Sequence, residues 1–256
     1  MRPYHVASTY DPMVSLPYTD IAAYLTRQFH TYQPHLQTIW DIACGTGNLT
    51  LPLAQAGFQV KGLDISPEML TIAQEKASSA QLNIPFVCQD MCEAYPGELV
   101  DAVTCLYGGL NFLDSTQALK QALTQVYAAL KPGGLFVFDQ FSADKMRAAF
   151  TGTRAGDWDD FSVVTRSQWF ETGLITHRVT FFLREPDGRY RRDEEEHHLR
   201  SHPFDELCHL LKETGFNVLQ VAEIYPQVNH RLLQDVYLFV AQKPLNQASD
   251  QRGQNE

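Results

Sequence analysis

The chain has 256 residues, 44% of them hydrophobic and 11% aromatic, a composition that excludes an intrinsically disordered protein. Its 20 Lys and Arg residues stand against 30 Asp and Glu residues, and the formal net charge of -10 opposes nonspecific attraction to nucleic-acid phosphates and anionic lipids. No apolar run approaches the roughly 20 residues that span a bilayer, and the N-terminus lacks the pattern of a signal peptide. We therefore expect a cytoplasmic protein, monomeric or homodimeric, without nucleic-acid or membrane partners.

The first 140 residues alternate between short apolar segments and helical patterns. Apolar residues at helical spacing predict an amphipathic helix over Ile21–Tyr32. Five strands are predicted after it, at Thr38–Ile42, Gln59–Leu63, Pro85–Gln89, Val100–Leu106 and Leu135–Asp139. Helices are predicted between them at Leu49–Ala56, Ser66–Ala80 and Ser115–Leu130. This alternation is typical of right-handed βαβ crossovers, and it predicts a mostly parallel α/β sheet with a ligand beyond the carboxyl ends of its strands.

The helix beginning at Ser66 has the clearest start in the sequence. Ser66 can accept a hydrogen bond from a free backbone amide, and Pro67 is tolerated at the first helical position. Glu68 faces the positive end of the helix dipole.

The pattern changes to that of antiparallel strands from Trp158 to Arg200. Strand-like runs at Phe161–Phe170, Leu174–Leu183 and Tyr190–Leu199 are separated by Glu171-Thr172-Gly173 and Pro186-Asp187-Gly188, which are turn signals. A helix is then predicted over Phe204–Lys212, with Gly215 ending it, followed by strands at Val218–Ile224 and Val236–Ala241. We therefore divide the chain into an N-terminal helical segment (1–37), a core (38–150 and 201–242), an inserted antiparallel β cap (151–200) and a disordered polar tail (243–256).

The stretch WDIACGTGNLT, from Trp40 to Thr50, ends the first predicted strand and opens the next helix. Gly45 and Gly47 let the chain turn tightly and leave bare backbone in the path of a ligand. Asp64 ends the second strand about 20 residues further on, where an acid receives ribose hydroxyls in nucleotide-binding βαβ units. Together, the turn and the acid predict a nucleotide-type ligand.

Two residues distinguish between the possible ligands of this turn. The dinucleotide fingerprint has a third glycine or alanine where this sequence has Thr50, and Asp41 would repel a pyrophosphate. S-adenosylmethionine carries an ammonium group and a sulfonium and no phosphate, so Asp41 can anchor its amino group. We therefore expect S-adenosylmethionine as the cofactor, with an NAD-dependent oxidoreductase as a disfavoured alternative.

Five segments, in order over roughly residues 38–140, resemble the motifs of class I S-adenosylmethionine-dependent methyltransferases. They are WDIACGTGNLT, VKGLDISPEML, CQDM, VDAVTCLYGGLNFL and ALKPGGLFVFD. The resemblance implies a Rossmann-like, mostly parallel seven-stranded sheet with helices on both faces and an inserted antiparallel β cap. The cap and the early YDPM are similar to the small-molecule branch that includes sugar-amine and glycine N-methyltransferases.

The resemblance also implies which residues bind the cofactor. In chain order these are Asp41, Ala43, Gly45, Gly47, Asp64, Ile65, Met69, Asp90, Met91 and Leu106. Of these, Asp41, Ala43, Gly45 and Gly47 would line the methionine part of the cofactor. Asp64 would take the ribose hydroxyls, and Asp90 would accept a hydrogen bond from the adenine amine. Leu106 and Tyr107 would lie where the family places the methyl group and its acceptor, although Gly108-Gly109 follows where the family often has an acid or polar residue.

Methyl transfer is a direct displacement, so the protein mainly has to align the acceptor with the methyl carbon. An amine acceptor needs little acid–base help, whereas a hydroxyl needs a general base. The base is not identified by the sequence, and the candidates are Tyr107, His197 and His198. Because neighbours on a strand point to opposite faces, only one of the two histidines can face the cleft. For His177, burial in the core and lining of the cleft are equally plausible.

The expected function is methyl transfer to nitrogen or oxygen of a small-molecule acceptor. A methyltransferase for tRNA or protein is the alternative that the acidic composition disfavours, and a non-catalytic S-adenosylmethionine-binding protein remains open. No metal site is predicted, because Pro203 breaks the helix that would align His198 with His202, and the 5 cysteines contain no CxxC pair.

Overall fold

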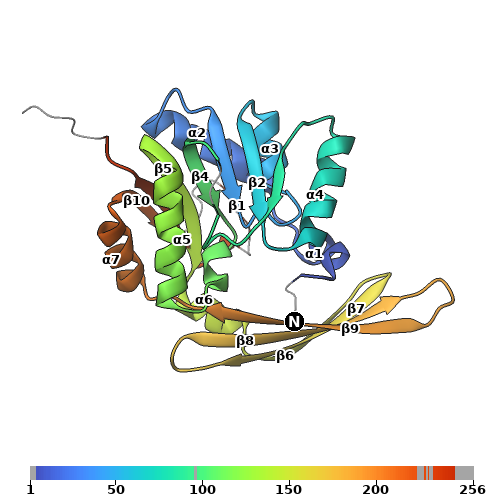
Figure 1. The fold of residues 1–256 in the computed structure, drawn as a ribbon. Helices are drawn as coiled ribbons and strands as arrows, with labels where there is room; N and C mark the ends of the chain where they lie inside the picture. Colours follow the sequence, from blue (N-terminus) through green and yellow to red (C-terminus); the bar gives the residue numbers. More distant parts are fainter. Residues whose placement is uncertain (1–3, 95–96, 224–227, 229, 231–232, 246–256) are drawn as a thin grey trace, which may run out of the picture.

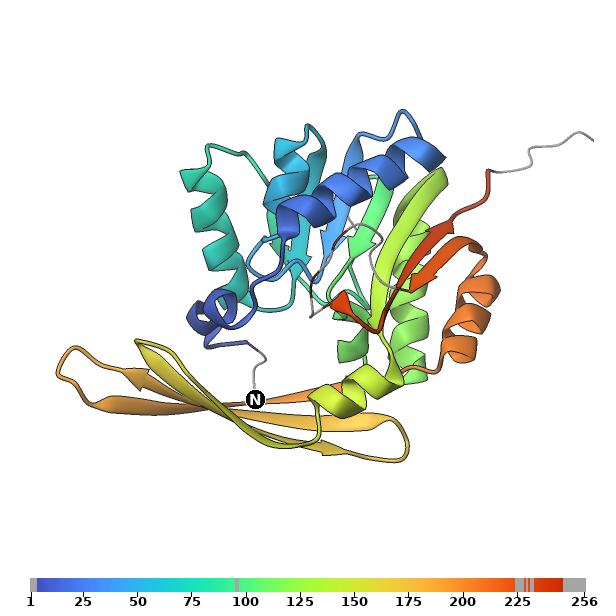
Figure 2. The same ribbon diagram turned by 180° about the vertical axis from the view of Figure 1, so that it is seen from behind.

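The computed structural model describes residues 4–94, 97–223, 228, 230 and 233–245. Within them the chain forms two sheets, drawn in Figure 1 and, from behind, in Figure 2. No helix in this described part is long and apolar enough to cross a membrane.

Among the described residues, seven strands form the larger sheet. They are β1 (Thr38–Ile42), β2 (Gln59–Asp64), β3 (Phe86–Cys88), β4 (Val100–Cys105), β5 (Leu130–Phe141), β10 (Asn217–Glu223) and β11 (Val236–Gln242). Their order is β10-β11-β5-β4-β1-β2-β3; the pairs from β5 to β3 are parallel, and β11 is antiparallel to both neighbours. The predicted mostly parallel seven-stranded sheet is confirmed. Its strand order reverses between β1 and β4, which is where such sheets bind ligands.

Helices cover both faces of this sheet (Figures 1 and 2). The α-helices are α1 (Tyr10–Met13), α2 (Tyr18–Tyr32), α3 (Thr50–Gln55), α4 (Pro67–Ser79), α5 (Thr116–Ala129), α6 (Ala143–Ala149) and α7 (Phe204–Thr214), with short 3₁₀ helices η1 (Ala7–Thr9) and η2 (Gly109–Phe112). Ile39 of β1 packs in one core with residues of α2 and α3, whereas Trp40 packs with residues of α5 and α7. Strand alternation therefore separates two apolar cores, one on each face.

The helix boundaries follow the capping signals of the sequence. The Ser66 side chain accepts from the backbone amide of Met69 at 3.1 Å, which confirms the predicted start of α4. Gly215 ends α7 with a φ of +105°, a left-handed conformation that glycine adopts without the steric cost of a side chain.

The smaller sheet is antiparallel and consists of β6 (Gly152–Asp157), β7 (Phe161–Trp169), β8 (Leu174–Arg184) and β9 (Tyr190–Arg200), in that order. Figure 1 shows it stretched beneath the carboxyl ends of the parallel strands, with the N-terminal segment between the two sheets. Val6 from that segment packs with Phe161, Val163, Val179 and Phe181 in a third, small core. The inner face of the smaller sheet is thereby joined to the rest of the chain.

Some elements differ from the prediction. β5 begins at Leu130 and includes Pro132-Gly133-Gly134, whereas the prediction ended a helix at Leu130 and began the strand at Leu135. Gly133 has a φ of +81° and its amide donates to Lys243 O, so the glycine lets the strand pair through an irregular stretch. α6 and β6 were not predicted. α6 buries only Met146, and β6 is almost wholly exposed, so neither has a hydrophobic pattern that could have indicated it.

Two predictions lie wholly or partly outside the described residues. Ile224, the predicted end of the strand from Val218, is one of these positions, as is the predicted disordered tail from residue 246 onward. The division of the chain into core and cap segments stays a prediction.

Candidate functional site

A cavity of about 490 Å³ lies between the carboxyl ends of the parallel strands and the inner face of the smaller sheet. Its volume falls within the range of roughly 300–1,000 Å³ that is common for ligand pockets. On the core side it is lined by eight of the ten predicted cofactor residues: Ala43, Gly45, Asp64, Ile65, Met69, Asp90, Met91 and Leu106. Facing them, residues of β8 and β9 form the wall on the sheet side. One space thus joins the predicted donor site to the predicted cap.

The glycine turn and the acid of β2 are hydrogen-bonded to each other. The amide of Gly45 donates to Asp64 Oδ2 at 2.8 Å, and the amide of Ser66 donates to Asp64 Oδ1 at 2.9 Å. Burial raises the pKa of Asp64 above its ordinary value, although these two amides oppose the shift. Gly45 has a φ of +54°, and a Cβ built on it would meet no atom within 4 Å. The backbone here is therefore bare and open, as a closely approaching ligand requires.

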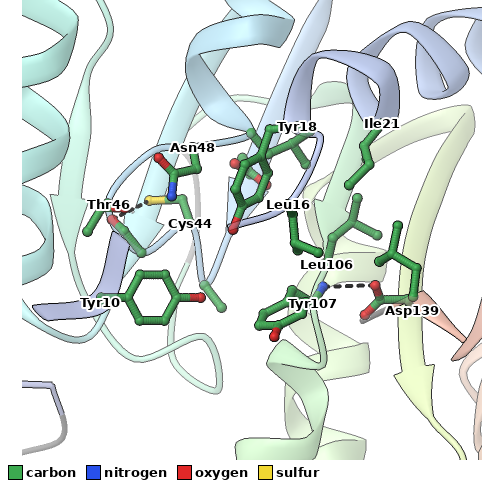
Figure 3. A pocket seen from close by; sticks show the side chains of 15 residues that line it. Tyr10, Leu16, Tyr18, Ile21, Cys44, Thr46, Asn48, Leu106, Tyr107 and Asp139 are labelled. Atoms are coloured by element: carbon green, nitrogen blue, oxygen red, sulfur yellow. Dashed lines mark hydrogen bonds between the residues drawn. The ribbon is translucent and has the colours of Figure 1, made fainter. Parts of the chain in front are cut away.

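Asp41 lines a smaller cavity of about 50 Å³ beside the large one, shown in Figure 3. Its Oδ2 accepts from Thr50 Oγ1 at 2.6 Å and its Oδ1 from Thr104 Oγ1 at 2.7 Å. Burial raises the pKa of Asp41 to about 6, against the effect of these two hydrogen bonds. Thr50 and Asp41, the two residues that disfavoured a pyrophosphate, are thus direct partners. Gly47 lines neither cavity, and its predicted role stays a prediction.

Asp139 is a residue of the small cavity that sequence reasoning missed. It ends the apolar run LFVFD in β5 and is fully buried. Its carboxylate accepts from the amide of Tyr107 at 2.9 Å, as Figure 3 shows, and from the amide of Gly108 at 2.6 Å. It thereby holds the turn after β4. Tyr107 has a φ of +59°, which is uncommon for a residue with a side chain. Asp139 could have been identified by the same signal as Asp41 and Asp64, which is an acid at the end of an apolar strand segment.

The N-terminal segment lines both cavities. Tyr10 lines each of them and Tyr18 lines the small one, where Figure 3 shows their rings beside Tyr107. Tyr4 lines the large cavity and was not identified from the sequence. The segment is anchored by Asp11, whose carboxylate accepts from side chains at the glycine turn and on α4. These donors are Thr46 Oγ1 at 2.7 Å, Asn48 Nδ2 at 2.8 Å and Lys76 Nζ at 2.5 Å.

Three histidines come from the smaller sheet, and they differ in burial. His197 is 5% exposed and lies 3.0 Å, through Nε2, from Glu195 Oε2. His198 also borders the cavity, but 58% of its side chain is exposed. Strand alternation therefore turns His197 inward and His198 outward, as predicted for neighbours. His177 lines the cavity as well, and burial together with the nearby His197 lowers the pKa of His177 to about 4, so it is neutral near pH 7.

The sheet order and the cavity at the strand ends define an α/β protein with a ligand site of the nucleotide-binding kind. A family model described as a methyltransferase domain matches residues 39–134. The chain is 34% identical to YqeM of Bacillus subtilis (strain 168), a protein with a provisional methyltransferase name, over 93% of this chain and 95% of that protein.

Two further comparisons agree. The chain is 28% identical to a glycine/sarcosine N-methyltransferase of Aphanothece halophytica, over 80% of this chain and 76% of that protein. Its fold is similar to an S-adenosylmethionine-dependent methyltransferase from Clostridium acetobutylicum ATCC 824, with a TM-score of 0.82 and 26% identity, over 93% of this chain and 98% of that one. The chain belongs to the class I S-adenosylmethionine-dependent methyltransferases. It is an enzyme, and its cofactor is S-adenosylmethionine.

Proposed function

We propose that this methyltransferase transfers a methyl group to nitrogen or oxygen of a small molecule that binds in the large cavity, with residues 151–200 as the substrate cap. The observation that carries the proposal is the single cavity bounded by the predicted donor residues on one side and by β8 and β9 on the other. The named acceptor of the Aphanothece halophytica relative, an amino acid, supports a small-molecule class.

The residues present fit the cofactor. Bare backbone at Gly45 can approach its methionine part, and Asp41 offers a carboxylate to the ammonium group. Asp64 and Asp90 lie in the wall of the large cavity, where they can accept from the ribose hydroxyls and from the adenine amine. When bound, the cofactor supplies a methyl carbon attached to a sulfonium, which is an electrophile that needs no nucleophile from the protein.

The remaining work of the chain is alignment and exclusion of water. Asp139 fixes the turn of Tyr107 and Gly108, and Tyr107 lines both cavities. Burial raises the pKa of Tyr107 well above its ordinary value, so its hydroxyl can donate a hydrogen bond but cannot act as a base near neutral pH. Among the three candidates, buried His197 is therefore the proton acceptor that we propose, in preference to Tyr107 and to exposed His198.

Cytoplasmic location, a monomeric or homodimeric state and the absence of nucleic-acid partners belong to the same proposal. The formal net charge of -10 supports the absence of nucleic-acid partners, and the location and the oligomeric state are expectations from the sequence. A basic surface would be needed for an RNA acceptor, because phosphate contacts dominate such affinity.

The test of the donor site is binding of S-adenosylhomocysteine, followed by calorimetry and by thermal unfolding. Asp64→Asn is expected to weaken binding at least about tenfold, which corresponds to about 1.4 kcal/mol. Asp101→Asn is the matched control, because Asp101 is a buried acid of the same sheet that binds Thr38 and Lys131 at its opposite end. Equal affinity of the wild type and Asp64→Asn would contradict the assigned ribose contact.

The test of the acceptor class is turnover. Purified protein with isotopically labelled S-adenosylmethionine is incubated with amines, hydroxy compounds, tRNA and protein extracts. Transfer to small molecules is expected, whereas transfer to tRNA or protein alone would contradict the proposal.

A further inference from the structure

The wall of the large cavity is acidic. Among the described residues, its lining includes the carboxylates of Asp64 and Asp90 on the donor side and of Glu195 on the acceptor side, and no Lys or Arg; Glu196, on the opposite face of β9, is paired with Arg178. A carboxylate or phosphate that leaves water for such a wall loses its hydration and meets no Lys or Arg of the lining in return, which is costly. This wall therefore disfavours an acceptor that carries an anionic group, and it favours one that carries a positive charge.

Glu195 is the acid on the acceptor side of this wall. Its side chain is 2% exposed, so its charge lies in a site shielded from water. Oε1 accepts from the amide of Val6 at 2.7 Å and lies 3.4 Å from Nδ1 of His5, and Oε2 lies 3.0 Å from Nε2 of His197. A carboxylate has about four lone-pair positions, so these three contacts leave room for one more donor.

His197 presents an unused nitrogen next to this carboxylate. Its Nδ1 is buried and has no hydrogen-bond partner among the described residues. Because Nε2 faces the Glu195 carboxylate, the neutral ring carries its hydrogen on Nε2 and a free lone pair on Nδ1. A carboxylate that fixes the tautomer in this way also stabilises the imidazolium that forms when Nδ1 takes a proton.

The other groups that face the His197 ring are uncharged near neutral pH. The rings of Tyr4, Phe112 and His177 lie 4.6, 6.0 and 6.1 Å from it, centroid to centroid. Burial raises the pKa of Tyr4 well above its ordinary value and lowers the pKa of His177 to about 4. Among these described neighbours, the Glu195 carboxylate is thus the charged group in contact with His197, with His5 on the far oxygen of the same carboxylate.

The rest of the acceptor side is apolar. The apolar side chains of this wall that come from β5, from the residue after α6 and from the smaller sheet are Phe141, Phe150, Val179, Phe181 and Leu199. An acceptor that fills this space has an apolar body, since burying such surface contributes about 25 cal/mol per Å². Phe112, which touches His197, lies in the turn after β4, so the charged pair and the donor side of the cavity are adjacent.

Resting on the function proposed above, we propose that the acceptor is an amine on an apolar body without an anionic group. It binds as an ammonium ion beside the buried Glu195–His197 pair, donating to Nδ1 of His197, and loses a proton to that nitrogen before the transfer. The freed nitrogen lone pair then forms the N–C bond while the C–S bond breaks and its electron pair goes to sulfur. The products are S-adenosylhomocysteine and an N-methylammonium, and His197 returns its proton to water. An amino-acid acceptor, such as the glycine named for the Aphanothece halophytica relative, is not expected.

The experiment measures binding of amines by calorimetry on protein saturated with S-adenosylhomocysteine. Saturation is demonstrated first, because a protein that does not bind S-adenosylhomocysteine would contradict the proposed function and not this inference. The ligands are matched sets: phenethylamine, 2-phenylethanol and 3-phenylpropionate, with cyclohexylmethylamine and hexylamine and their alcohols and carboxylates. The amine of at least one set is expected to bind tenfold or more tightly than its alcohol and carboxylate, about 1.4 kcal/mol. Carboxylates that bind as tightly as amines, or the absence of binding by every amine, would overturn the proposal, whatever the variants show.

Two variants test the residues. Glu195→Gln is expected to remove the preference for the amine, whereas Glu194→Gln, on the opposite face of the same strand, is expected to keep it. His197→Gln is expected to keep amine binding and to lower kcat at neutral pH by about a hundredfold or more. The kcat of His197→Gln should recover as the pH approaches the pKa of the free amine, because the amine then binds already deprotonated. A preference that survives Glu195→Gln, or a His197→Gln variant with unchanged kcat at neutral pH, would contradict the assigned roles.

Discussion

Replacement of Asp41 by asparagine is expected to stabilise the ligand-free protein at neutral pH and to weaken its binding of S-adenosylhomocysteine. Asp41 is 2% exposed, and its two oxygens accept from the hydroxyls of Thr50 and Thr104. A hydroxyl can either donate or accept, so both threonines can adjust to an amide. The substitution therefore removes a buried charge and keeps the packing.

The magnitude follows from the pKa. Burial raises the pKa of Asp41 from 3.8 to about 6, so the folded state holds a proton that the unfolded chain has already released between these two values. Stability from this group is fully present below about pH 4 and is lost as the pH rises through about 6. At about 1.4 kcal/mol per pH unit, ionised Asp41 costs the folded state about 3 kcal/mol at neutral pH, and Asp41→Asn avoids this cost.

Urea unfolding between pH 4 and pH 8 checks this reasoning. The stability gained by Asp41→Asn should be near zero at the acidic end and should grow to its full value above pH 6. Asp101→Asn is the control of opposite sign: burial would raise the pKa of Asp101, but hydrogen bonds from Lys131 and Thr38 outweigh it and hold that pKa below its ordinary value. Asp101→Asn should therefore destabilise the protein at neutral pH. A loss of stability in Asp41→Asn at every pH, or an unchanged affinity for S-adenosylhomocysteine, would refute our account of Asp41.

Two further substitutions test parts of the fold that position the site. Ser66→Ala removes the cap of α4 and should lower the free energy of unfolding, measured in urea, by about 1 kcal/mol. Ser66→Asp is the control, because it restores a hydrogen-bond acceptor at the cap. An equal loss of stability in both variants would contradict the capping role. Asp139→Ala leaves the buried amides of Tyr107 and Gly108 without their acceptor, so it should cost about 1–3 kcal/mol per unsatisfied group and should also raise the KM for S-adenosylmethionine. An unchanged KM would mean that the turn after β4 keeps its shape without Asp139.

Much of the core could be predicted from the sequence because its signals are local. The start of β1, the cap at Ser66 and the glycine that ends α7 each depend on a few neighbouring residues. The donor side of the site is local in the same sense. Gly45 and Asp64, which are 19 residues apart, follow successive parallel strands, so the topology alone brings them together.

The wall formed by the smaller sheet could not be predicted in the same way. Alternation indicates that His197 and His198 face opposite sides, but not which side faces the core. That choice is made by contacts between residues far apart in the chain, such as the bond from the amide of Val6 to Glu195, which spans 189 positions. Glu195 lies in the charged run RYRRDEEEHHLR, from Arg189 to Arg200, and such runs usually face water. Only its burial distinguishes it from its neighbours.

The donor side and the acceptor side of the site are built from different parts of the fold, and this difference affects how the specificity for the acceptor can change. Donor contacts come largely from backbone and from acids at strand ends, which the parallel sheet places in the same position whatever the surrounding sequence. Acceptor contacts come from one face of an antiparallel sheet, where a substitution at every second position alters the wall without disturbing the strand pairing. A change at Glu195 could therefore alter the charge of the acceptor while the donor site stays intact. Measuring S-adenosylhomocysteine affinity alongside amine preference in Glu195→Gln tests this independence, since the affinity should remain within about twofold of the wild type.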